Sequence, residues 1–174
     1  PEKILFETKF WEFCKLFSFF TKGKISDVKK NIRLIENIKE PDEILDEKSE
    51  NGKKLVNSVK KIVSEYRKLL KKAIEGNSND NLLIFTYVNK NYSFTSDLSN
   101  ELVYRYPNKF IIVARERGGE MKMSLRSGKY KVRDILEEAL KQVNGYGGGH
   151  LFAAGANIPV SEFGKFIEII KKKV

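Results

Sequence analysis

The sequence predicts an α/β domain preceded by an α-helical segment. Up to Gly76, apolar residues recur at intervals of three and four, which is the period of amphipathic helices. After the polar stretch 76–81, short apolar runs alternate with helical patterns, as in domains where strands and helices share one sheet. We therefore place the boundary at this stretch, with a helical segment over residues 1–76 and an α/β domain over residues 81–174.

Three helices are expected in the helical segment. The first is unusually apolar, because aromatic and leucine side chains cover more than one stripe of it: Phe6, Phe10, Trp11, Phe13, Leu16, Phe17, Phe19 and Phe20. It is interpreted either as a core helix or as a docking surface for a further domain or a partner. Ser26 and Asp27 are candidate N-caps of the second helix, and Pro41 with Asp42 marks a turn. The third helix is long, amphipathic and ended by Gly76.

Strands and helices alternate in the second half. The expected elements are strands at Leu82 to Val88, Phe110 to Ala114 and Glu120 to Ser127, and helices at Ser96 to Arg105, around Val132 to Leu140, and at the C-terminal end with Ser161 as cap. Gly118 and Gly119 predict a tight hairpin turn before the third strand.

The charge balance favours a phosphate-rich partner. Thirty-three Lys and Arg stand against 23 Asp and Glu, a formal net charge of +10, although such an excess also serves solubility. No run of eighteen uncharged apolar residues occurs, so no membrane partner is expected. The single Cys14 cannot form an internal disulfide and charged residues interrupt the first apolar stretch, so a cytoplasmic location is expected. The start at Pro1, without Met, suggests that an upstream part was removed.

The segment 145–155 holds the main candidate site. Four of the five residues from 145 to 149 are glycine, which lets a ligand approach the backbone, and a turn of this kind can form an anion-binding nest. His150, the only histidine, ends the run and can donate a hydrogen bond to a phosphate oxygen. The structural alternative is a tight turn in which His150 caps a backbone carbonyl.

A second candidate lies at the end of the third expected strand. The guanidinium of Arg126 and the hydroxyls of Ser124 and Ser127 can meet a phosphate together, whereas the structural alternative is a solvated arginine at a strand end. Strand ends and glycine-rich loops commonly line one cleft in α/β folds, so the two candidates are expected to converge in space.

The two candidate segments together resemble a known family. The run Ser124-Leu125-Arg126-Ser127, followed by Gly147-Gly148-Gly149-His150 and then Ala153-Ala154-Gly155, is similar to the signature of the DHH-associated domain, the C-terminal module of DHH phosphoesterases. The resemblance covers about Asn81 to Val174 and implies a small mixed-sheet α/β domain. It also implies phosphate-binding roles for Arg126, Gly147, Gly148, Gly149 and His150, and less directly for Ser124 and Ser127.

The resemblance separates binding from cleavage. DHH phosphoesterases hydrolyse phosphodiester bonds with an Asp-His-His motif and further Asp ligands that hold two metal ions. This chain has no such motif, and its sole histidine belongs to the glycine-rich segment. The expectation is therefore no catalytic residue and no metal ligand in this chain, with manganese or magnesium held by a missing N-terminal catalytic domain.

The resemblance also implies a parent protein and its partners. The expected parent is a RecJ-like single-strand-specific exonuclease of the archaeal type, a hydrolase of DNA replication and repair, so single-stranded DNA or RNA and the GINS replication complex are expected partners. Bases can stack on Tyr146 or Phe152 if these rings are exposed. Three alternatives stay open: a phosphodiesterase for short oligonucleotides or cyclic dinucleotides, the related domain of an alanyl-tRNA synthetase, and a non-catalytic replication-complex binding module.

Overall fold

The computed structural model describes residues 8–174 and divides into two compact units, one ending at Lys68 and the other spanning Leu69–Val174. The division falls within the long helix α5 (Glu50–Glu75), which ends directly before Gly76. Within residues 8–174, no helix combines the length and the apolar character that crossing a membrane requires.

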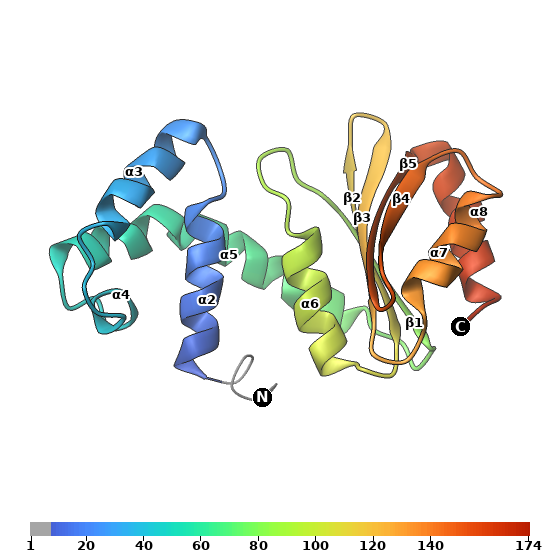
Figure 1. Ribbon diagram of the computed structural model, residues 1–174, viewed down its shortest axis with the longest axis horizontal. Helices are drawn as coiled ribbons and strands as arrows, with labels where there is room; N and C mark the ends of the chain where they lie inside the picture. The colour runs from blue at the N-terminus through green and yellow to red at the C-terminus, as the bar shows by residue number, and fades with distance from the viewer. Residues whose placement is uncertain (1–7) are drawn as a thin grey trace. The chain divides into compact units, whose positions relative to one another are not determined.

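Over its described residues, 8–68, the first unit contains helices and no strand: α2 (Lys9–Phe20), α3 (Ile25–Ile35), α4 (Asp42–Leu45) and the first part of α5 (Figure 1). Phe19 and Phe20, in the last turn of α2, are fully buried, and the Phe19 ring centroid lies 5.2 Å from that of Tyr66 in α5. Phe10, in the first turn, is 50% exposed, and Phe6 lies outside the described residues. The aromatic helix thus enters the core through its last turn.

The predicted N-cap of the second helix is wrong. Helix α3 begins one residue before Ser26, with Lys24 at the N-cap, because the Lys24 carbonyl already accepts the N–H of Asp27 in the first turn. Ser26 and Asp27 therefore lie inside the helix and do not cap it. Pro41 lies in a turn, as predicted, and is the N-cap residue of the short helix α4, in which Ile44 is buried.

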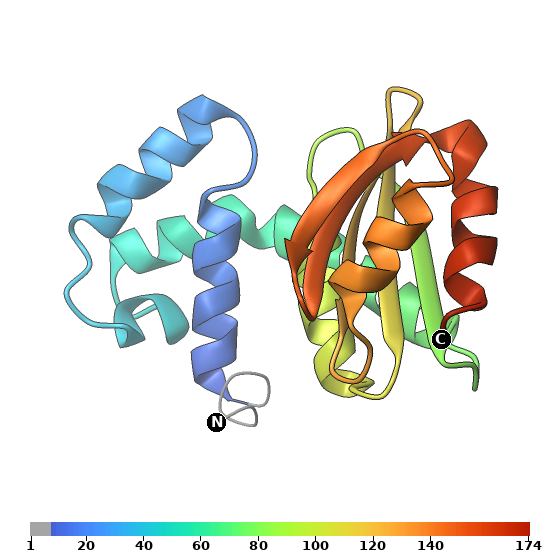
Figure 2. The same ribbon diagram turned by 45° about the vertical axis from the view of Figure 1, so that its right-hand side comes forward.

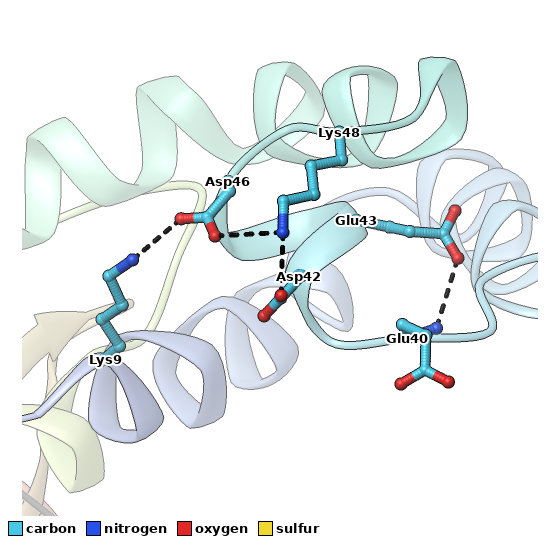
Figure 3. Close-up of polar contacts among 6 residues, drawn as sticks. All are labelled: Lys9, Glu40, Asp42, Glu43, Asp46 and Lys48. Carbon is cyan, nitrogen blue, oxygen red and sulfur yellow. Dashed lines mark hydrogen bonds and ion pairs between the residues drawn. The ribbon is translucent and has the colours of Figure 1, made fainter.

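An exposed network of charged groups joins α4 to its neighbours (Figure 3). Asp46 accepts a hydrogen bond from Lys9 at 2.9 Å, and Lys48 donates to Asp42 at 2.9 Å. The hydrogen bond from Lys9 lowers the pKa of Asp46. The Glu43 carboxylate accepts the backbone N–H of Lys39 and Glu40, and these bonds lower its pKa as well. Exposed pairs of this kind contribute little to stability, so burial of apolar side chains dominates in this unit.

The second unit is an α/β domain with a mixed sheet, as the sequence predicts. Its elements are β1 (Leu82–Val88), α6 (Thr95–Arg105), β2 (Phe110–Arg117), β3 (Glu120–Ser127), α7 (Val132–Leu140), β4 (Tyr146–His150), β5 (Ala153–Pro159) and α8 (Val160–Lys171). The sheet order is β1-β2-β3-β5-β4. β1 and β2 are parallel and joined through α6, whereas the other neighbours are antiparallel.

Local signals place most boundaries of the second unit correctly. β1 and β3 have the predicted bounds, and β2 runs three residues further than predicted, to Arg117, because it pairs with β3 up to the hairpin turn. Gly118 and Gly119 form that turn with φ of 62° and 78°, as a two-residue type I′ turn requires. The predicted cap of α8 is wrong, because the helix begins at Val160 with Pro159 at the N-cap and Ser161 lies inside it.

Helices lie on both faces of the sheet (Figures 1 and 2). On one face α7 and α8 cover a continuous apolar core that includes Phe110, Ile112, Met123, Leu125, Ala154, Ala156, Ile158, Leu136 and Phe166. On the other face, here called the α6 face, α6 packs on β2 and β3. Gly148, His150 and Gly155, on the last two strands, are exposed. A polar strip of sheet therefore remains accessible beside α6.

Candidate functional site

The glycine-rich segment is an edge strand and not a turn. β4 pairs antiparallel with β5, with Gly148 opposite Gly155 and His150 opposite Ala153. The prediction of an anion-binding nest is wrong, because a nest needs successive N–H groups that curl around one point, whereas an extended strand points them alternately to its two sides. His150 is exposed and makes no hydrogen bond with residues 8–174, so it does not cap a carbonyl.

Strand register brings the two candidate segments together, as expected. One cross-strand row contains Arg126, Ala153 and His150, and the next contains Ser124, Gly155 and Gly148. Directly opposed residues point to the same face, and alternate residues of the core strands are buried under α7 and α8, so both rows lie on the α6 face. Two strand spacings separate Arg126 from His150, which is roughly 10 Å between their Cα atoms.

Arg126 is a positive charge without an acidic partner in the described part of the chain. Its Nε donates to Asn100 Oδ1 of α6 at 2.9 Å, and its Nη1 donates to the carbonyls of Leu125 and Ala154 at 2.9 and 3.1 Å. All of these acceptors are neutral. Burial lowers the pKa of Arg126, but an arginine stays charged at neutral pH. The guanidinium is thus held in place by neutral groups, with its charge uncompensated by any carboxylate.

The glycines of this region are of two kinds. A Cβ on Gly147 would lie 2.6 Å from the Gly155 carbonyl oxygen, and one on Gly149 would lie 2.4 Å from that of Ala153, so packing within the sheet requires both glycines. A Cβ on Gly148 would meet nothing within 4 Å, and one on Gly155 would make an ordinary contact at 3.5 Å. Neither packing nor a positive φ explains these two exposed residues. We call the pair Gly148 and Gly155 the glycine floor.

The two predicted serines have different surroundings. Ser124 borders Gly155 on the glycine floor, is 9% exposed, and its hydroxyl makes no hydrogen bond with residues 8–174. The Ser127 hydroxyl donates to the Lys109 carbonyl at 2.9 Å and accepts the N–H groups of Lys129 and Tyr130. Ser127 therefore holds the turn before α7, and strand alternation points it away from the α6 face.

Two residues that position Arg126 were not predicted from the sequence. Asn100 and Ser96 lie four residues apart on α6, hence on one side of the helix, and both approach the guanidinium. A pair of small polar residues at this spacing is common on exposed helix faces. Only the packing of α6 on the sheet shows that this side faces Arg126.

The comparisons with known proteins decide the family. Residues 79–174 match the DHHA1 domain. The chain belongs to the DHHA1 domain family. The DHHA1 domain is the DHH-associated module of DHH-family phosphoesterases, which confirms the resemblance stated from the sequence. No curated protein sequence matches the chain significantly.

Solved structures share the fold of this DHHA1 chain. RecJ from Thermus thermophilus, in complex with Mg²⁺, aligns with a TM-score of 0.58 and 14% identity over 86% of this chain and 23% of the RecJ chain. The pGpG-specific phosphodiesterase PggH from Vibrio cholerae aligns with a TM-score of 0.57 and 16% identity, over 91% of this chain and 56% of the PggH chain. A RecJ exonuclease bound to manganese aligns with a TM-score of 0.51 and 14% identity, over 76% of this chain and 34% of the exonuclease chain. The chain thus spans about a quarter of the Thermus RecJ chain and just over half of PggH.

Proposed function

We propose that the DHHA1 domain of this chain binds the phosphodiester backbone of a single-stranded nucleic acid for a RecJ-like DHH phosphoesterase. The observation that carries the proposal is the glycine floor beside Arg126. Arginine binds phosphate oxygens through its planar fork, and bare glycine backbone lets a sugar-phosphate chain lie close to the sheet. The unpartnered Ser124 hydroxyl and the exposed His150 supply further donors around the same floor.

Exposed aromatic rings near the floor support a strand rather than a free phosphate as the ligand. Tyr146 is 68% exposed, and its hydroxyl lies 3.1 Å from Asn157 Nδ2 on the same face. Phe152, between β4 and β5, is 46% exposed. Base stacking on such rings contributes about 1 to 3 kcal/mol per base without sequence preference.

Cleavage is proposed for a separate catalytic domain that holds manganese or magnesium. Within residues 8–174, no three His, Cys, Asp or Glu side chains lie close enough together to hold a metal ion. The role proposed for this chain is to fix the strand so that the catalytic domain meets one phosphodiester bond.

A second candidate ligand is a very short oligonucleotide. The glycine floor is one residue pair wide, which fits a single phosphate and its sugar. PggH, which shares the fold, is described as specific for pGpG. A length series separates the two candidates. Affinity that stops rising beyond two or three nucleotides favours the short ligand.

Binding to a labelled 5′-phosphorylated single strand, measured by fluorescence anisotropy across a salt series, tests the proposed function. We expect affinity to fall with salt, by about 0.7 log units per phosphate contact per log unit of salt. His150→Ala should weaken binding about fivefold, because one hydrogen bond is worth about 1 kcal/mol. The control Asn144→Ala, an exposed residue before β4, should bind like the wild type. Absence of binding, or equal binding by all three proteins, would contradict the proposal.

Gly148→Ala is expected to weaken binding without destabilising the fold. Its methyl group would meet nothing within 4 Å among residues 8–174 but would project from the glycine floor, where the proposed ligand backbone lies. Gly147→Ala, one residue away, should instead destabilise the domain by about 1 to 3 kcal/mol through overpacking. Urea denaturation and anisotropy on both variants make the comparison. Unchanged affinity in Gly148→Ala would show that no ligand approaches this residue.

A further inference from the structure

Two buried side-chain atoms lack a hydrogen-bond partner within residues 8–174, and both belong to one cross-strand row. They are Nε of Arg115 and Oδ1 of Asn157, in side chains that are each only 6% exposed. Arg115 of β2 pairs with Lys122 of β3, and Lys122 pairs with Asn157 of β5. Because opposed residues share a face, this row lies on the α6 face, as the glycine floor does.

Arg115 makes no hydrogen bond or ion pair with any residue of the described chain. Its neighbour on β1 is Tyr87, whose hydroxyl accepts the Phe94 N–H at 2.6 Å just before α6 begins. Burying an unpaired charge is costly, and a bound anion would offset that cost. The side chain of Lys122, next in the row, is 51% exposed and adds a second cation that a ligand can reach.

Asn157 requires the opposite kind of partner. Its Nδ2 donates to the Glu120 carboxylate at 2.8 Å and lies 3.1 Å from the Tyr146 hydroxyl. A carboxylate can only accept, so the amide cannot be flipped and the unpartnered atom is an acceptor. A ligand at this row must therefore offer acceptors to Arg115 and a donor to Asn157. A nucleotide offers both, through its phosphate and through a sugar hydroxyl or a base N–H.

We propose that Arg115, Lys122 and Asn157 form a second subsite, which binds an internal nucleotide of the strand whose end lies on the glycine floor. This inference rests on the proposed function and deepens it. Lys122 and Arg126 are four residues apart on β3, which is roughly 14 Å. A stacked strand rises about 3.4 Å per nucleotide, so about four steps separate the two sites. The ligand is then an oligonucleotide longer than a dinucleotide.

Glu120 is an acidic group in the neighbouring row of the same face, opposite Arg117 and Pro159. Its carboxylate lies 4.0 Å from Lys122 and accepts the Asn157 amide. It therefore weakens the field that a phosphate meets at Lys122. Gln at this position keeps an acceptor for Asn157 and removes the charge, so Glu120→Gln is expected to tighten binding of a long strand about threefold, the scale of an exposed ion pair.

The test compares 5′-phosphorylated thymidine dinucleotide and octanucleotide on the full chain. Arg115→Met should weaken octanucleotide binding about tenfold, as loss of a charged hydrogen bond does, and leave dinucleotide binding unchanged. Arg33→Met, which removes an exposed arginine of α3, is the matched charge control. Ligand-free Arg115→Met should melt no lower than the wild type, because replacing an unpaired buried charge by an apolar side chain is neutral or stabilising.

The outcomes separate this subsite from the proposed function. If the wild type binds neither oligonucleotide, both the proposed function and the second subsite are refuted. If binding depends on Arg126 while Arg115→Met and Glu120→Gln behave like Arg33→Met, the second subsite alone is refuted. A lower melting temperature of ligand-free Arg115→Met would also refute it, because the charge would then be satisfied within the chain.

Discussion

Arg126→Met is expected to lower the affinity for a 5′-phosphorylated single strand by roughly ten- to a hundredfold. A hydrogen bond to a charged group is worth about 1.5 to 3 kcal/mol, and no carboxylate among residues 8–174 competes for the guanidinium beside the glycine floor. The affinity of Arg126→Lys should lie between those of the wild type and Arg126→Met, because lysine keeps the charge but loses the planar fork. Fluorescence anisotropy at fixed salt gives the affinities, and far-UV circular dichroism checks the fold.

Arg133→Met is the matched control for this experiment. Arg133 lies in α7 of the same unit, but its guanidinium contacts the carboxylates of Asp134 at 3.2 Å and Glu137 at 3.9 Å. Its charge is already compensated, so its removal should change affinity little. If Arg133→Met and Arg126→Met weaken binding equally, overall charge and not a specific site holds the strand.

Gly52→Ala is expected to destabilise the helical unit by about 3 kcal/mol, the upper end of the usual cost of overpacking. Gly52 lies in the first turns of α5, where a Cβ would sit 1.8 Å from the Glu43 carbonyl oxygen and 2.6 Å from its carbon. Both are backbone atoms, so α4 would have to move. The usual gain from alanine in a helix, about 1 kcal/mol, does not offset this clash.

Gly164→Ala provides a control of the opposite sign. Gly164 is an exposed residue within α8, and a Cβ there would meet nothing within 4 Å. This substitution should therefore stabilise the protein by about 1 kcal/mol. Urea denaturation followed by circular dichroism measures both variants. If Gly52→Ala and Gly164→Ala changed the free energy of unfolding equally and in the same direction, the close approach of α4 to Gly52 would not limit stability.

Local sequence signals are sufficient to predict most of the helices and strands and to predict the family. The apolar run of β1, the Gly118-Gly119 turn and the helical spacing before Gly76 each act over fewer than about thirty residues, the range of a single element or hairpin. The residues around Arg126 and His150 likewise carry the DHHA1 resemblance by their order along the chain.

The character of the site depends on contacts between distant segments. A run of glycines has low strand propensity, and residues 146–150 form a strand only because β5 pairs with them. That pairing decides which glycines packing needs, Gly147 and Gly149, and which it leaves open, Gly148. The side-chain partners of Arg126 come from α6, and the isolation of Arg115 follows from burial in the sheet. Register and burial arise from the cooperative packing of the whole domain, so the pattern of single segments cannot determine them.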